Sequence, residues 1–443
     1  MRDLLVMIVI LGSAPICFFS PYYGLLVWTW ISYFNPHRFA WGMAYGFPVA
    51  EVIAVPTLAG LIFAADSNRK IFKRETFLLL GLWMWFIISF LVAKQTPLFA
   101  DHVQAGQAEL ERVSKILLMT MVTIILVTSL KRLKYLALVI GMSFGVLGIK
   151  GALFGIRTGG EGLVWGPPSS FVSDNNDLAL AINMSLPILF FLAREEKNRI
   201  LRSLLWFAFV ASIFSVILTY SRGGLLGLAA VLGMLAIKAR RKLLAIVCLG
   251  ATAFVLMTYA PQKWMTRMET FMGGQLDASA KGRINAWYFS YNLAKDYPLT
   301  GGGFGTFTPD LFHRYAPDPL DFHGPHSIYF QMLAEQGFVG LTLFLLLLAS
   351  TIHSLRKLRH RAQEVPGAEP LVPYANALEV GIYAFLVGGA FLGRAYFDLW
   401  FQLVACCVVL KILLSKERTR VAEEQVKEEA RATEELEMPV AAT

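Results

Sequence analysis

Long apolar segments, separated by short polar ones, dominate this sequence. About 20 consecutive apolar residues are needed to cross a bilayer, and within hydrocarbon a helix pairs all of its own backbone groups. Segments of suitable length lie near residues 4–20, 48–65, 75–93, 114–130, 134–155, 176–193, 203–220, 223–237, 243–260, 327–350, 374–393 and 395–413. Hydrophobic residues make up 56% of the chain, well above the share in an average soluble domain. We therefore predict an all-α polytopic membrane protein with about twelve transmembrane helices.

Three other segments near the membrane allow structural predictions. The stretch from Tyr22 to Phe34 follows Pro21 and is rich in Trp and Tyr, which indicates an interfacial or re-entrant piece. The segment from Lys94 to Lys115 has loosely helical spacing and predicts a short helix along the outer face. The N-terminal apolar run has no clear small-residue cleavage site, so we expect an uncleaved signal anchor.

Basic residues indicate the orientation of the chain, because short loops rich in Lys and Arg stay in the cytoplasm. They gather in alternate loops, within residues 69–74, 131–134, 194–202, 238–242, 356–361 and 416–420. Those loops, and both termini with them, are expected inside. The net charge of +9 is mostly this topology signal, so no nucleic-acid partner is expected. The oligomeric state cannot be read from the sequence.

Residues 261–326 form the longest polar segment, and the orientation places it outside. Arg283 lies near the start of an amphipathic stretch, Ile284–Leu293, which predicts a helix on the membrane surface. Trp287 and Tyr291 in that stretch could line a sugar site, although aromatic residues at a membrane interface are typical of belt positions. Further on, the glycines of Pro298-Leu299-Thr300-Gly301-Gly302-Gly303-Phe304-Gly305 allow tight turns. The segment ends at His326, either a plain helix-start residue or a catalytic one.

Two shorter outward segments carry further candidate binding residues. Ser173 or Asp174 could cap the following helix, and Asn175 and Asn176 are candidates for sugar binding. The other segment is a tight turn, Thr219-Tyr220-Ser221-Arg222-Gly223-Gly224, between two apolar spans. Its arginine is either an interfacial anchor or part of a phosphate site, in which Gly223, Gly224 and the helix N-terminus face the same anion as the guanidinium.

The order of these motifs resembles the O-antigen ligase superfamily, which includes O-antigen polymerases and bacterial protein O-oligosaccharyltransferases. The resemblance covers roughly residues 160–410 and rests on the Asn-containing loop, Ser-Arg-Gly-Gly between two spans, Gly-Arg and the glycine-rich segment in the large loop, and His326 followed by Glu-Gln-Gly-Phe-Val-Gly-Leu. The N-terminal Asn35-Pro36-His37-Arg38 is similar to the extension of O-glycosylation ligases in that group. One departure is Ser327, where members often have Asn.

The resemblance implies a GT-C type glycosyltransferase in the bacterial inner membrane, with its site on the periplasmic face. We divide the chain accordingly. Residues 1–160 would form N-terminal transmembrane helices with the interfacial segment, and residues 161–260 ligase-like transmembrane helices. A large periplasmic loop (261–326), C-terminal transmembrane helices (327–414) and a charged cytoplasmic tail (415–443) would follow. The donor would be a glycan on undecaprenyl diphosphate and the acceptor lipid A-core oligosaccharide. By motif match, Arg222 and Arg283 would hold the diphosphate and His326 would act at the acceptor hydroxyl. Tyr220, Gly223, Gly224, Asn175 and Asn176 are further candidate substrate contacts.

Physical chemistry independently favours this assignment of roles. A sugar diphosphate is already a good leaving group, so the reaction needs charge stabilisation at the phosphates more than a general acid. Two arginines supply it without a metal or another cofactor. The acceptor hydroxyl loses a proton as it attacks, and a neutral imidazole is a suitable base. Attack in line with the departing diphosphate predicts inversion at the anomeric carbon.

Three alternatives stay open. The acceptor could be a second lipid-linked glycan, which would make the protein a polymerase, or a Ser or Thr side chain of a protein. A transporter would belong to another class, but the spans lack the charged or Gly/Pro-broken midplane features of a carrier. A metal-dependent transferase is the third, because Asp318 and Asp321 lie just before the histidines, although such carboxylates in a Pro-rich turn commonly face solvent.

Overall fold

The computed structural model describes residues 1–239 and 278–437, and every regular element in these residues is helical. The α-helices are α1 (Arg2–Phe19), α2 (Pro21–Phe34), α3 (Val49–Leu61), α4 (Arg74–Gln95), α5 (Val103–Leu126), α6 (Leu130–Arg157), α7 (Asn175–Glu195), α8 (Arg199–Leu218), α9 (Arg222–Lys238), α12 (Ala278–Asp296), α13 (Pro309–Tyr315), α14 (Ile328–Glu364), α15 (Val372–Gly389) and α16 (Asp398–Glu437). Short 3-10 turns precede α5 and α15. The span predicted at 243–260 lies outside the described residues.

Within the described residues, eight helical segments are long and apolar enough to cross a membrane: those of α1, α4, α6, α7, α8, α14, α15 and α16. The prediction of an all-helical polytopic membrane protein is thereby confirmed. Three other predicted spans fall on α3, α5 and α9, which are shorter or more polar. At 14 residues, α2 is about 21 Å long, too short to cross about 30 Å of hydrocarbon.

The centre of the bundle is α7, which packs against α6, α8, α9 and α15. Nearly every residue of α7 is buried, as expected for a helix that is apolar on all sides. Small residues let its neighbours approach closely: a Cβ at Gly148 of α6 would lie 2.2 Å from the hydroxyl oxygen of Ser212 in α8. The first half of α16 is buried against the same bundle.

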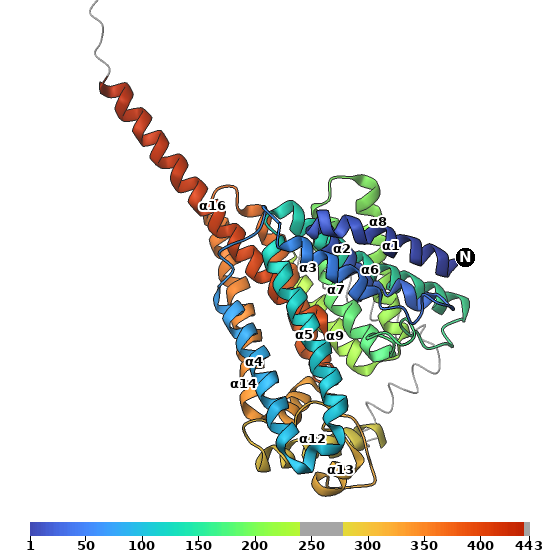
Figure 1. Ribbon diagram of the computed structural model, residues 1–443. Helices are drawn as coiled ribbons and strands as arrows, with labels where there is room; N and C mark the ends of the chain where they lie inside the picture. Colours follow the sequence, from blue (N-terminus) through green and yellow to red (C-terminus); the bar gives the residue numbers. More distant parts are fainter. Residues whose placement is uncertain (240–277, 438–443) are drawn as a thin grey trace, which may run out of the picture.

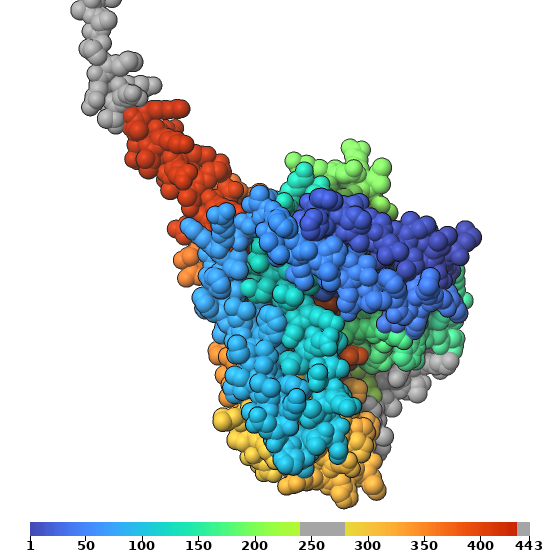
Figure 2. All heavy atoms as spheres, in the orientation of Figure 1, coloured from blue at the N-terminus to red at the C-terminus, as the bar shows by residue number. Residues whose placement is uncertain are grey.

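A second group of helices, α4 and α14, lies side by side and connects two differently built ends of the molecule (Figure 1). At one end, α12 and α13 form a small helical cap over the start of α14. At the other end, the exposed part of α16 projects away from the bundle (Figure 2).

The short surface helix predicted within residues 94–115 is replaced by a longer element. The structure has a 3-10 turn over Pro97–His102, and α5 then runs without a break from Val103 to Leu126. Its polar first turns are stabilised by ion pairs within the helix, between Glu109 and Arg112 and between Glu111 and Lys115. Because these pairs tolerate solvent, one helix extends from the core into the polar region.

Candidate active site

The candidate site begins at α12, whose first turns carry Arg283. The helix predicted within this segment is present and extends from Ala278 to Asp296. Two of its side chains hold the loop that leads to His326. Asn285 donates to the backbone oxygens of Asp318 and Asp321 at 2.7 and 3.0 Å. Trp287 donates to the carbonyl of Pro325 at 2.9 Å, so this aromatic residue fixes the backbone next to His326.

His326 lies half-buried between the cap and the start of α14. Its φ of 40° is in the left-handed region, which is uncommon for residues other than glycine and is found at constrained functional positions. Burial lowers the pKa of His326 from its ordinary value of 6.5, and the positive charge of Arg283 lowers it further. His323 and Arg394 act in the same direction, whereas Asp174 raises it. The histidine is therefore held neutral within a group of charged side chains.

Asp174 and its neighbours at the start of α7 form a hydrogen-bonded cap. The carboxylate of Asp174 accepts from the backbone N–H and the side-chain amide of Asn176, at 2.8 and 2.9 Å, which confirms the capping interpretation. Asn175 is buried and donates to the carbonyl of Thr219 at 2.8 Å. Asn175 thereby ties α7 to the turn before α9. Sugar binding by Asn175 and Asn176 stays a prediction.

The turn that carries Arg222 is held by its neighbours. Ser221 caps α9 by accepting from the N–H of Gly224 at 2.9 Å. Tyr220 has a φ of 56°, and its hydroxyl donates to the carbonyl of Gly160. A Cβ at Gly224 would lie 2.6 Å from the Cβ of Ala179 in α7, so this glycine is required for helix packing.

Gly223 connects the same turn to the loop between α15 and α16. A Cβ at Gly223 would lie 3.2 Å from the Cβ of Phe391, three residues before Arg394. Contact of Tyr220, Arg222 and the two glycines with an anion stays a prediction.

Arg394 is a site residue that the sequence analysis missed. It forms an ion pair with Asp177 in the first turn of α7, and its guanidinium lies 4.8 Å from the ring centroid of Phe171. A Cβ at the preceding Gly393 would lie 3.5 Å from the backbone nitrogen of His326. The hydropathy pattern placed two spans on either side of this arginine with no loop between them. The signal that could have found it was the position of a lone cation at that boundary.

These contacts bring five separate segments together. The start of α7 contacts both the turn before α9, through Asn175, and the loop before α16, through Asp177 and Arg394. That loop contacts His326, which in turn lies within electrostatic range of Arg283 on α12. The result is a half-buried site, built where the cap meets the bundle, in which His326 lies among arginine and aspartate side chains.

Comparison with protein families gives a match over a region that holds part of this site. Residues 207–345 match the model of the O-antigen ligase family. This segment of the chain is similar to the O-antigen ligase family. The resemblance proposed from the motifs is confirmed, and Arg222, Arg283 and His326 all lie within the matched residues. A second model, for a family of unknown function, matches residues 1–197. The comparison with curated proteins gave no match.

The glycine-rich segment contacts a break in α14. Gly337 has a φ of 66° and a ψ of −171°, a conformation open only to glycine, and it divides α14 into two parts. At this break the N–H groups of Gly302 and Gly303 donate to the carbonyls of Ala334 and Glu335, at 2.8 and 3.0 Å. Ser89 of α4 donates to the carbonyl of Thr300 at 2.8 Å. The segment therefore joins the cap to α14 and α4.

The two carboxylates considered for a metal are engaged in the loop before His326. A side-chain oxygen of Asp318 accepts from the N–H of Leu320 at 3.1 Å, and one of Asp321 lies 2.7 Å from Nδ1 of His323. In the part of the chain that the structure describes, no three His, Cys, Asp or Glu side chains gather in a way that could hold a metal ion.

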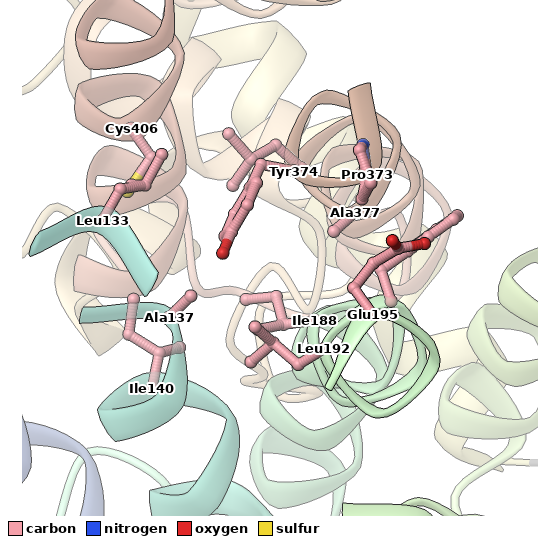
Figure 3. Close-up of a pocket in the computed structure, with 12 residues that line it drawn as sticks. Leu133, Ala137, Ile140, Ile188, Leu192, Glu195, Pro373, Tyr374, Ala377 and Cys406 are labelled. Carbon is pink, nitrogen blue, oxygen red and sulfur yellow. The ribbon is translucent and has the colours of Figure 1, made fainter. Parts of the chain in front are cut away.

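A separate cavity of about 30 Å³ lies between α6, α7, α15 and α16, with room for one or two water molecules (Figure 3). Its walls are mostly apolar, and the hydroxyl of Tyr374 points into it. Glu195 and Pro373 place it at the ends of α7 and α15 away from His326. It is therefore not part of the ligase site.

Proposed function

We propose that this protein is an O-antigen ligase that transfers a glycan from undecaprenyl diphosphate to lipid A-core oligosaccharide on the periplasmic face of the inner membrane. The observation that carries the proposal is the half-buried His326, which lies within the residues matched to the O-antigen ligase family and has its pKa lowered among Arg283, Arg394 and Asp174. A base and a group of cations are what the transfer requires. Both termini would then be cytoplasmic, and the protein would be a GT-C type transferase.

The reaction follows from these residues. An acceptor hydroxyl oxygen attacks the anomeric carbon of the donor sugar, and its proton passes to His326 as the new C–O bond forms. The bond between the anomeric carbon and the diphosphate oxygen breaks on the opposite face, which inverts the configuration. The electron pair stays on undecaprenyl diphosphate, where Arg222 and Arg283 stabilise the added charge. No metal takes part in these steps.

Arg394 acts as a positioning residue in this scheme. Its ion pair with Asp177 fixes the loop whose backbone contacts His326. Its charge also helps to keep the imidazole neutral. We expect Arg394 to orient the base rather than to bind substrate.

The decisive test is His326→Ala in cells whose own ligase gene is deleted. Transfer should be abolished, because the substitution removes the proposed base, while membrane insertion stays intact. The measurement is the lipopolysaccharide ladder on a gel, with the amount of protein in the membrane determined in parallel. His313→Ala is the matched control, since His313 is exposed on α13 and should leave the ladder unchanged. A normal ladder from His326→Ala would refute the proposed role.

Deletion of the gene for this protein in its own host, with the other glycan enzymes intact, separates the acceptor classes. A ligase defect leaves polymerised glycan on the lipid carrier and none on the core. A polymerase defect instead gives core carrying a single repeat, and a protein glycosylation defect leaves the ladder normal. The last two outcomes would each replace the ligase proposal while keeping the site.

A further inference from the structure

A strongly basic cavity lies at the end of the α4–α14 pair away from His326. Along α14, Ile328 and Lys357 are separated by roughly 44 Å at the rise of an α-helix. The cavity has a volume of about 430 Å³ and lies between α4, α14 and α16. Six Lys and Arg side chains line it: Lys73, Arg74, Lys357, Arg361, Lys411 and Arg418.

Only part of this charge is compensated. Glu75 is fully buried beside the cavity, where it pairs with Lys411 and lies 3.4 Å from Arg74. The hydroxyls of Ser350 and Ser354 also donate to its carboxylate, at 2.9 and 2.6 Å. Glu75 is thus committed to two of the six cations.

The four other cations lack such a partner. Among the side chains that the structure describes, those of residues 1–239 and 280–431, no carboxylate lies within 4.0 Å of the amino or guanidinium groups of Lys73, Lys357, Arg361 or Arg418. Like charges around one cavity repel each other, and a bound anion would relieve the repulsion. The contrast with the other side of α14 is informative, because there Arg356 and Arg359 share the buried Glu379.

The surroundings indicate that the anion is attached to a lipid. Leu358 and Leu414 line the cavity together with the cations. One turn beyond Arg74, the outer surface of α4 exposes Phe77, and Met84 follows two turns later. This surface suits acyl chains, and the cavity suits the phosphate from which they extend. A small soluble anion would need no such apolar wall.

We propose that this cavity binds the headgroup of an anionic phospholipid, with the phosphate between α4, α14 and α16 and the acyl chains along α4. The arrangement is that of a basic pocket between membrane helices. The proposal does not depend on the ligase function. Bound lipid would join three helices that otherwise repel each other at this end of the protein.

The test uses the purified full-length protein in a neutral detergent, with thermal unfolding followed while phosphatidylglycerol is added. The lipid should raise Tm in a saturable manner, because it binds only the folded state. Phosphatidylcholine and inorganic phosphate should not do so at equal concentrations. In Lys357→Gln/Arg361→Gln the apparent affinity should fall about 30-fold, on the basis of about 1 kcal/mol for each cation.

Arg199→Gln/Arg202→Gln is the matched control. It removes the same charge from exposed positions on α8, outside the cavity, and should respond like the wild type. If the first variant fails to fold, Lys73→Gln/Arg418→Gln removes two other uncompensated cations. Equal responses from the cavity variants and the wild type would overturn the proposal, as would an equal Tm shift with inorganic phosphate or phosphatidylcholine.

Discussion

Neighbours of both signs determine the charge of His326. Burial and Arg283 keep the imidazole neutral, and Asp174 opposes them. Since a base must be unprotonated to accept a proton, transfer should persist as pH falls below 6.5, the ordinary pKa of histidine, and should be lost as pH falls through the lower pKa of the folded protein.

The acid limb of the pH profile is the pH range over which transfer is lost on acidification. Substitution of Asp174 and of Arg283 should move this limb in opposite directions. In Asp174→Asn the negative charge is lost, the pKa of His326 falls further, and the limb moves to lower pH. Asn is also a good N-cap, so α7 should remain intact. In Arg283→Gln the pKa rises, and the limb of the residual activity moves to higher pH. The measurement is the pH profile of transfer from a defined polyprenyl-diphosphate glycan in vitro.

Asp310→Asn controls for general charge effects, because Asp310 is exposed on α13. Its profile should match the wild type. Shifts of the same sign in Asp174→Asn and Arg283→Gln would exclude His326 as the group that titrates.

Local sequence was sufficient for some site residues and not for others. Asp174 could be identified as a cap, because a capping residue is recognised by the helix that follows it. Arg283 and His326 stood out as polar residues beside apolar segments. Arg394 did not, because its partner Asp177 precedes it by 217 residues and only the folded bundle brings them together.

At the scale of elements, the contact between the glycine-rich segment and α14 should determine whether the cap forms. Gly337→Ala should strongly destabilise the protein. Its backbone conformation costs a residue with a side chain about 1–3 kcal/mol. In addition, the new Cβ would lie 2.1 Å from the carbonyl oxygen of Leu299. The measurement is Tm of the purified protein, together with protease sensitivity of the cap.

Gly81→Ala on α4 provides the comparison, because a Cβ there meets nothing within 4 Å. Its Tm should be nearly unchanged. A Gly337→Ala variant as stable as Gly81→Ala would show that the break in α14 does not need glycine.

Helices were predicted better than their ends and their contacts. Hydropathy locates α4, α7 and α14 because a bilayer-spanning helix must be apolar over its length. Hydropathy could not show that α5 begins at Val103, because the first turns of this helix are polar. They are stabilised by ion pairs between side chains, which a hydropathy profile does not register. Nor could it show that the glycines at 301–305 lie against Gly337, a contact between segments that are each locally irregular.

At the scale of the whole molecule, α16 combines a buried half with an exposed one. Lys416 ties α16 to two loops, donating to the side chain of Asn68 and to the carbonyl of Thr128 at 3.0 and 3.1 Å. Residues 422–431 are exposed. Truncation after Arg420 should therefore change neither Tm nor transfer, as measured by thermal unfolding and the lipopolysaccharide gel.

Truncation before Lys416 is the informative comparison, since it removes those bonds and should lower Tm. If truncation after Arg420 abolished transfer while Tm stayed the same, the exposed half of α16 would have a role in the reaction.

The left-handed backbone at His326 also affects the stability of the whole protein. An L-residue in this conformation costs roughly 1–2 kcal/mol, and Gly or Asn adopts it more readily. If the transfer activity were no longer under selection, replacement of this histidine by Gly or Asn would stabilise the protein. With His326 in its proposed role as the base, activity and thermal stability place opposite demands on this position, and a screen for heat resistance alone would select variants that have lost the histidine.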